Sequence, residues 1–82
     1  MHDVHLADNI LKICRKKSAN KLVKKVKIKL GSIIEHGEQI KPENLRFNLE
    51  MLSRNTNFAK AIFEIESVSG DTFEIEYLET VD

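Results

Sequence analysis

The alternation of hydrophobic and polar residues begins with a helical pattern at the start of the chain. Residues 4–17 carry apolar side chains at the spacing of one helix face. Asp3 precedes them in the position of an N-cap, and Arg15, Lys16 and Lys17 suit the negative end of the helix dipole. The sequence therefore predicts an N-terminal helix that buries one face.

A second helical pattern begins at Pro42, which favours the first position of a helix, with Glu43 in the first turn. The segment Asn55-Thr56-Asn57 is expected to close this helix. Its predicted apolar stripe consists of Leu45, Leu49 and Leu52, with Phe47 and Met51 beside it.

Three segments alternate as half-buried strands do: residues 22–30 (LVKKVKIKL), 60–68 (KAIFEIESV) and 72–79 (TFEIEYLE). The predicted buried rows are Val26, Ile28 and Leu30, then Ala61, Phe63 and Ile65, then Phe73, Ile75 and Tyr77. Between the last two strands, SGD at 69–71 favours a hairpin turn that pairs Ile65 with Ile75 and Phe63 with Tyr77. Gly31 begins a predicted loop, GSIIEHGEQIK.

The element order is therefore α-β-α-β-β. The predicted fold class is α+β, with two helices packed on one face of a three-stranded mixed sheet, in a single domain over residues 1–82. The β-α-β portion should form a right-handed parallel crossover if its two strands are neighbours.

The charged residues of the three predicted strands bear on the order of these strands in the sheet. The predicted outer faces carry Lys25, Lys27 and Lys29 on the first strand, Glu64 and Glu66 on the second, and Glu74 and Glu76 on the third. A lysine strand between two acidic strands would bring opposite charges together, whereas the short turn favours adjacent second and third strands. The sequence leaves this order open. Either way, the lysines are best explained as a solvated sheet face, and we expect no binding to nucleic acid.

Composition narrows the class of protein. The chain has 82 residues, equal numbers of basic and acidic residues, and a single cysteine, Cys14, which excludes an internal disulfide and a four-cysteine zinc site. No apolar run reaches the length of a membrane span and no signal peptide is visible, so we expect a cytoplasmic protein without a membrane partner. No nucleophile elbow, P-loop or dinucleotide fingerprint is present, so an enzyme is not expected.

The opening residues offer the most specific chemistry. The Met1 amine, the amide and imidazole nitrogens of His2 and the amide of Asp3 can provide four planar nitrogen donors, which suit Ni(II) or Cu(II). The alternative is a disordered terminus with an incidental histidine. His5, in the first helical turn, and His36, in the predicted loop, are weaker candidates, and each can equally be a solvated surface residue.

The stretches MHDVHLADNIL, VKKVKIKLG, IKPENLRFNLEML and AIFEIESV together resemble the HypA/HybF family along nearly the whole chain. Members of this family are nickel metallochaperones for [NiFe]-hydrogenase maturation, and some also serve urease. The resemblance implies that Met1, His2 and Asp3 form a nickel site in which His2 dominates. It also implies that the nickel ion is delivered to a maturation GTPase or directly to a nickel apo-enzyme. The family has Glu where this chain has Asp3, which keeps the charge and shortens the carboxylate.

Three departures from the family pattern stand out. Family members carry a zinc module with two C-x-x-C pairs between the second and third strands, and here a tight turn near 69–71 replaces it, so no structural zinc is expected. Lys41 stands before Pro42, where the family often has an acidic residue. The loop over 31–40 is also longer than usual and brings His36 with two glutamates.

Two hypotheses of different classes result. The first is a HypA-like nickel carrier that is not an enzyme. The second is a metal-independent interaction module that kept the fold and binds a protein partner through a sheet edge or helix face, or forms a homodimer by strand pairing.

Overall fold

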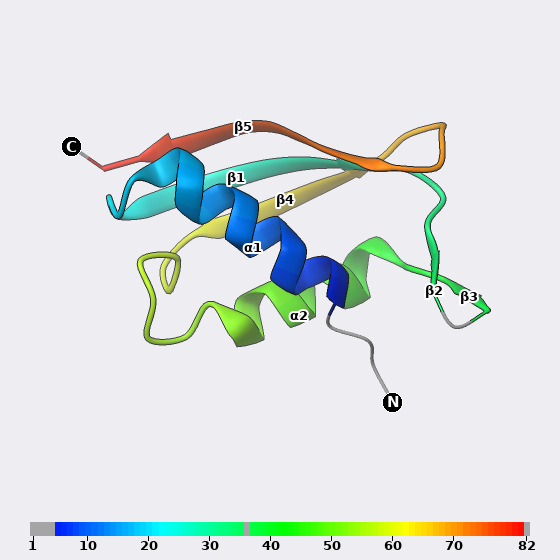
Figure 1. Cartoon of the computed structure of the whole chain (residues 1–82), viewed down its shortest axis with the longest axis horizontal. Coiled ribbons are helices and arrows are strands. Elements are labelled where there is room, and N and C mark those ends of the chain that lie inside the picture. Colours follow the sequence, from blue (N-terminus) through cyan, green and yellow to red (C-terminus); the bar gives the residue numbers. More distant parts are fainter. Residues whose placement is uncertain (1–4, 36, 82) are drawn as a thin grey trace.

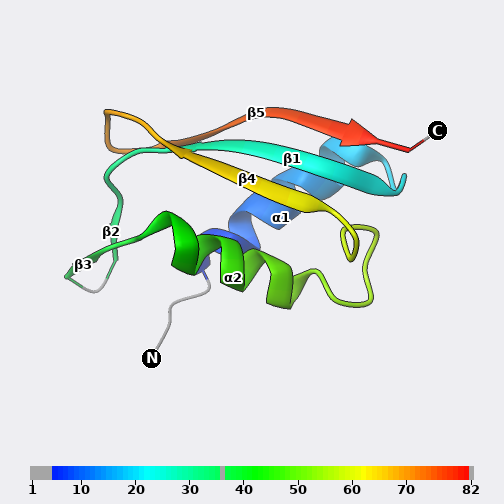
Figure 2. The same ribbon diagram turned by 180° about the vertical axis from the view of Figure 1, so that it is seen from behind.

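The computed structural model describes residues 5–35 and 37–81. Figure 1 shows the α-β-α-β-β order predicted above, with one small hairpin in addition. The elements are α1 (His5–Ser18), β1 (Val23–Leu30), β2 (Ile34–Glu35), β3 (Glu38–Gln39), α2 (Pro42–Leu52), β4 (Ile62–Ser67) and β5 (Phe73–Thr80). The predicted α+β class is confirmed, with both helices on one face of a three-stranded mixed sheet (Figures 1 and 2).

The strand order is β4-β1-β5, so the lysine strand lies in the centre. β1 runs parallel to β4 and antiparallel to β5. The predicted hairpin that paired Ile65 with Ile75 and Phe63 with Tyr77 is wrong, because β4 and β5 are separated by β1. The connection over 68–72 instead crosses the end of β1, and its backbone bonds to β1 and the residues that follow it.

Tyr77 does not lie in the buried row that strict alternation predicts. Lys27 pairs with Tyr77 but Ile28 pairs with Ile75, so the ladder contains an irregularity at Glu76. The extra residue shifts the alternation by one, as a β-bulge does. Tyr77 is therefore exposed on the outer face beside Lys25, and Leu78 takes the inner position opposite Val26.

The core lies between the sheet and the helices. The predicted row of β1, which consists of Val26, Ile28 and Leu30, is fully buried. Leu45 and Leu49 of α2 are fully buried as well. Phe58, in the connection from α2 to β4, fills the same core with only 1 % of its surface exposed. Phe47 and Met51 are exposed, so the buried stripe of α2 is narrower than the sequence indicates.

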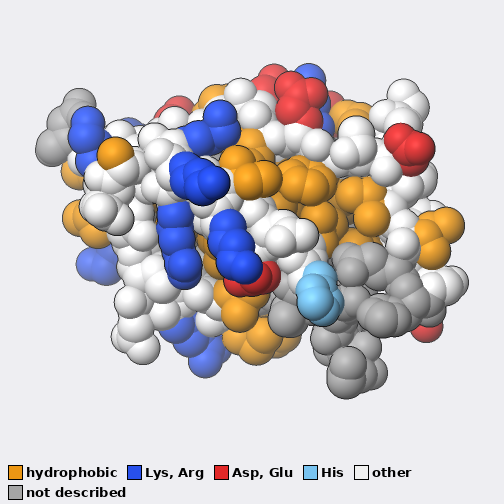
Figure 3. Space-filling model, viewed as in Figure 1, with side chains coloured by type: hydrophobic (Ala, Val, Ile, Leu, Met, Phe, Trp, Pro, Cys, Tyr) orange, Lys and Arg blue, Asp and Glu red, His pale blue; other side chains and the backbone are white. Residues whose placement is uncertain are grey.

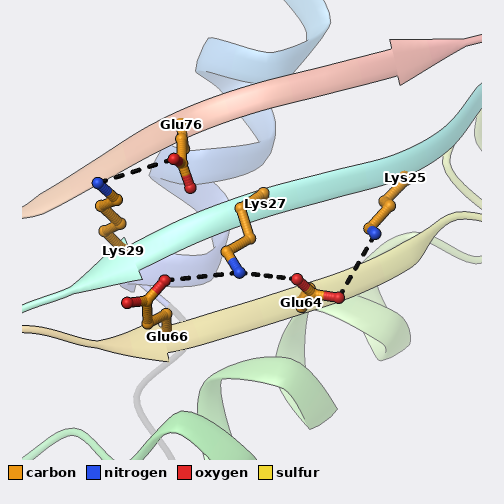
Figure 4. Close-up of polar contacts among 6 residues, drawn as sticks. All are labelled: Lys25, Lys27, Lys29, Glu64, Glu66 and Glu76. Carbon is orange, nitrogen blue, oxygen red and sulfur yellow. Dashed lines mark hydrogen bonds and ion pairs between the residues drawn. The ribbon is translucent and has the colours of Figure 1, made fainter.

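Ion pairs cross the outer face of the sheet (Figure 4). The Lys27 ammonium lies 2.7 Å from one Glu64 oxygen and 3.5 Å from Glu66, while Lys25 lies 3.4 Å from the other Glu64 oxygen. Lys29 reaches Glu76 of β5 at 3.7 Å. The central position of β1 lets its lysines approach acidic residues on both sides, which relieves the repulsion that adjacent acidic strands would create.

The segment predicted as a loop contains the β2–β3 hairpin. Ile34 pairs with Gln39, and the Ile40 amide donates to the Ile33 carbonyl at 2.8 Å. Ile33 and Ile40 pack against the core and fix both ends of the hairpin. Gly37 has a φ of 82°, a left-handed conformation that glycine adopts without steric cost, so it suits the turn.

Candidate metal centre

The candidate centre is at the beginning of α1. Three of the predicted ligands, Met1, His2 and Asp3, lie outside the described residues. His5 is exposed in the first turn of α1, and the next two residues, Leu6 and Ala7, are buried in the core. The core therefore holds α1 in place from Leu6 onward.

Two other segments lie at the same end of the molecule. Figures 1 and 2 both place the first turn of α1, the β2–β3 hairpin and the beginning of α2 together at this end. The weaker candidate His36 lies outside the described residues, but the hairpin that contains it is described on both sides, and Glu38 is exposed on β3. The fold thus brings the hairpin to the end of the molecule that carries His5.

The remaining groups near α1 have other roles. Asp8 accepts the Lys12 ammonium at 3.0 Å, one helical turn along. Cys14 is completely buried, and burial raises the pKa of its thiol to about 11 although Lys17 nearby acts in the opposite direction. A metal binds the thiolate, so a buried thiol with a raised pKa is a poor ligand near neutral pH. Cys14 is a core residue.

Residues 5–35 and 37–81 include no group of three or more His, Cys, Asp or Glu side chains that could hold a metal ion. Among the residues that the structure describes, His5 is therefore not part of a cluster of three such side chains. Sequence reasoning also missed the β2–β3 hairpin. The sequence does carry a signal for this hairpin, because Gly37 lies between Glu35 and Glu38 and isoleucines stand on both sides.

Comparison with known proteins identifies the family. The family model described as "Hydrogenase/urease nickel incorporation, metallochaperone, hypA" matches residues 1–74. The chain belongs to the HypA family. Among solved structures, the solution structure of the Ni metallochaperone HypA from Helicobacter pylori matches with a TM-score of 0.73, over 99 % of this chain and 98 % of that one, at 11 % sequence identity. That likeness concerns the fold. The search of curated proteins gave no match.

Membership of the HypA family defines the general class of activity. The family consists of metallochaperones that take part in nickel incorporation into hydrogenase and urease, and it is not a family of enzymes. Among the described residues, neither helix is long and apolar enough to cross a bilayer. At the candidate centre, the first turn of α1 is anchored in the core, and the β2–β3 hairpin lies at the same end of the molecule.

Proposed function

We propose that this HypA family member binds Ni(II) through Met1, His2 and Asp3 and carries it to a nickel enzyme during maturation. The observation that carries the proposal is the family match, which begins at residue 1 and so includes the opening Met-His-Asp. His2 is the dominant ligand in this proposal. His5 and His36 remain weaker candidates.

The donor set suits nickel for a chemical reason. The Met1 amine, the His2 amide and the Asp3 amide are successive backbone nitrogens, and the His2 imidazole closes a further chelate ring. Four nitrogens in one plane are a geometry that Ni(II) and Cu(II) accept, whereas zinc prefers a tetrahedral set. Deprotonation of the two amides compensates the charge of the metal. That compensation matters because the positive end of α1, which begins at His5, disfavours a cation.

The anchoring of α1 supports a carrier role. Leu6 and Ala7 are buried and His5 before them is exposed, so the helix that follows the proposed ligands is anchored in the core. We propose that the nickel ion is held at the surface of this helix end. A surface site lets a receiving protein approach the metal directly. We propose a maturation GTPase or a nickel apo-enzyme as the receiver.

We extend the proposal to zinc. The connection between β4 and β5 is limited to residues 68–72 and contains no cysteine, and the only cysteine of the chain is Cys14. The two C-x-x-C pairs that HypA family members place between these strands have no counterpart here. In this proposal the domain over 1–82 carries nickel without a structural zinc.

A Ni(II) titration followed by visible absorption and circular dichroism tests the proposal. Untagged protein is expected to bind one nickel with a square-planar spectrum. A chain with one extra residue before Met1, and the His2→Ala variant, should both lose this spectrum. His5→Ala is the matched control, because it removes an imidazole of the same helix end and should keep the spectrum.

Unchanged nickel binding by His2→Ala would exclude the tripeptide as the site. If the native chain shows no spectral change with Ni(II), the metal-independent interaction module becomes the better explanation. Far-ultraviolet circular dichroism of each variant separates loss of the site from loss of the fold.

A further inference from the structure

β5 leaves one edge of the sheet open. The strand pairs with β1 on one side only, and in Figures 1 and 2 no described element lies beyond it. Over Phe73–Thr80 the backbone groups that point away from β1 have no strand partner within the described chain. Such an edge is a template to which another extended chain can add.

The charge on this edge is unbalanced. Among the described residues, Glu74 and Glu79 make no ion pair, and Glu76 has a single partner, Lys29, at 3.7 Å. The acidic residues of the opposite edge differ, since Glu64 and Glu66 are both held by lysines of β1 (Figure 4). Glu74 and Glu79 lie opposite Lys29 and Lys25 in the register, but these lysines pair with Glu76 and Glu64 instead. The less compensated negative charge of the sheet therefore lies on β5.

The inner face of β5 is also incompletely covered. Phe73, Ile75 and Leu78 are only half-buried, whereas the inner residues Val26 and Ile28 of β1 have no exposed surface. Figure 3 shows hydrophobic side chains gathered at the surface between β5 and α1. The apolar layer thus continues to the edge of the sheet, where an additional strand would cover it.

We propose that β5 accepts an extended segment of a partner protein in which lysines or arginines alternate with apolar residues. The basic residues of this segment would lie beside Glu74, Glu76 and Glu79 on the outer face. Its apolar residues would extend the inner row of Phe73, Ile75 and Leu78. The bulge at Glu76 divides the edge into 73–75 and 77–80, so pairing is continuous within each stretch.

The same charges disfavour a second copy of the chain as the occupant. Both sheet edges, β4 and β5, carry glutamates on the outer face, so pairing of two copies through either edge would oppose like charges. The basic strand of each copy, β1, is already paired on both sides. A separate basic segment is therefore the occupant that the charges favour.

The chain provides its own probe. A peptide with the sequence of residues 22–30, LVKKVKIKL, alternates basic and apolar residues, and a peptide with glutamate at each lysine is the matched control. The peptides are titrated into the isotopically labelled full chain and observed by NMR. The lysine peptide is expected to shift the amides of β5 more than those of β4. The glutamate peptide is expected to leave both unchanged.

Charge reversal on the protein completes the test. Glu74→Lys combined with Glu79→Lys should weaken binding of the lysine peptide by about tenfold, from the usual worth of cross-strand charge pairs. Glu50→Lys, at an exposed position of α2, should leave it unchanged. Shifts at β4, equal binding of both peptides, or a dimer of the free chain that forms through β5 would each overturn the proposal. Nickel is absent from these samples, so the result is independent of the proposed metal site.

Discussion

The amide nitrogen of Gly31 donates a hydrogen bond of 2.8 Å to the carbonyl oxygen of Thr72. Next to it, the amide of Ser32 donates to Gly70 at 2.8 Å, and the amide of Val68 donates to Leu30 at 2.9 Å. These three bonds hold the connection from β4 to β5 across the end of β1. They explain how so short a connection joins two strands that are not neighbours.

Replacement of Gly31 by alanine is expected to weaken this crossing. A Cβ atom at this position would lie 2.6 Å from the Thr72 oxygen and 2.8 Å from the Gly70 oxygen, both of which are backbone atoms. We expect Gly31→Ala to lower the free energy of unfolding by about 1–3 kcal/mol, as overpacking commonly does. Urea denaturation followed by circular dichroism measures the change.

The neighbouring Ser32 provides the control, because it is exposed and Ser32→Ala leaves its backbone bond in place. This variant should lie within about 0.5 kcal/mol of the native chain. Equal stability of the Gly31→Ala and Ser32→Ala variants would show that the connection moves aside without cost.

The helices and strand positions could be predicted from the sequence because local patterns decide them. Pro42 begins α2 as expected, and Val26, Ile28 and Leu30 form a buried row. The strand order depended on tertiary contacts of Gly31 and the connection over 68–72, which no local pattern contains. The lysines of β1 favoured the observed order, with β1 between β4 and β5. The short turn after β4 favoured the wrong order, in which β4 and β5 are neighbours.

The position of Tyr77 shows a different limit. Strict alternation predicts it beside Ile75, but a single extra residue in the ladder reverses every later position. Phe58 was missed because it lies in an irregular connection without periodicity. The candidate ligands Met1, His2 and Asp3 were found from donor chemistry and family resemblance, and they stay a prediction because they lie outside the described residues.

Phe58 and Phe47 form a matched pair for measuring the contribution of the core. Phe58 has 1 % of its surface exposed and Phe47 has 60 %. Phe58→Ala should cost about 3–5 kcal/mol of unfolding free energy, because it removes a buried ring and leaves a cavity. Phe47→Ala should change it by less than about 0.5 kcal/mol. Thermal unfolding of both variants, observed by calorimetry, provides the comparison.

Because small domains are only marginally stable, Phe58→Ala can leave too little folded protein to measure. Phe58→Leu is the milder variant and keeps part of the buried volume. A large loss of stability for Phe47→Ala, or none for Phe58→Leu, would contradict the packing described above.

The ion pair between Lys27 and Glu64 predicts a measurable pKa change. The hydrogen bond from Lys27, with the charges of Lys25 and Lys27, lowers the pKa of the Glu64 carboxyl from 4.5. Conversely, the hydrogen bond to Glu64 raises the pKa of Lys27 from 10.5. Lys27→Met should therefore raise the pKa of Glu64 toward 4.5, and Lys25 should keep it from reaching that value. Side-chain carboxyl NMR across a pH series measures this.

The sign of the effect on stability follows from proton linkage. Because the pKa of Glu64 is lower in the folded state, its contribution is present above pH 4.5 and is lost as the pH falls through the folded pKa. Because the pKa of Lys27 is raised, its contribution is present below pH 10.5 and is lost as the pH rises through the folded value. Lys12→Met, which removes the partner of Asp8 on α1, is the control and should leave the pKa of Glu64 unchanged. If Lys27→Met also leaves the pKa of Glu64 unchanged, the Lys27–Glu64 pair does not persist in solution.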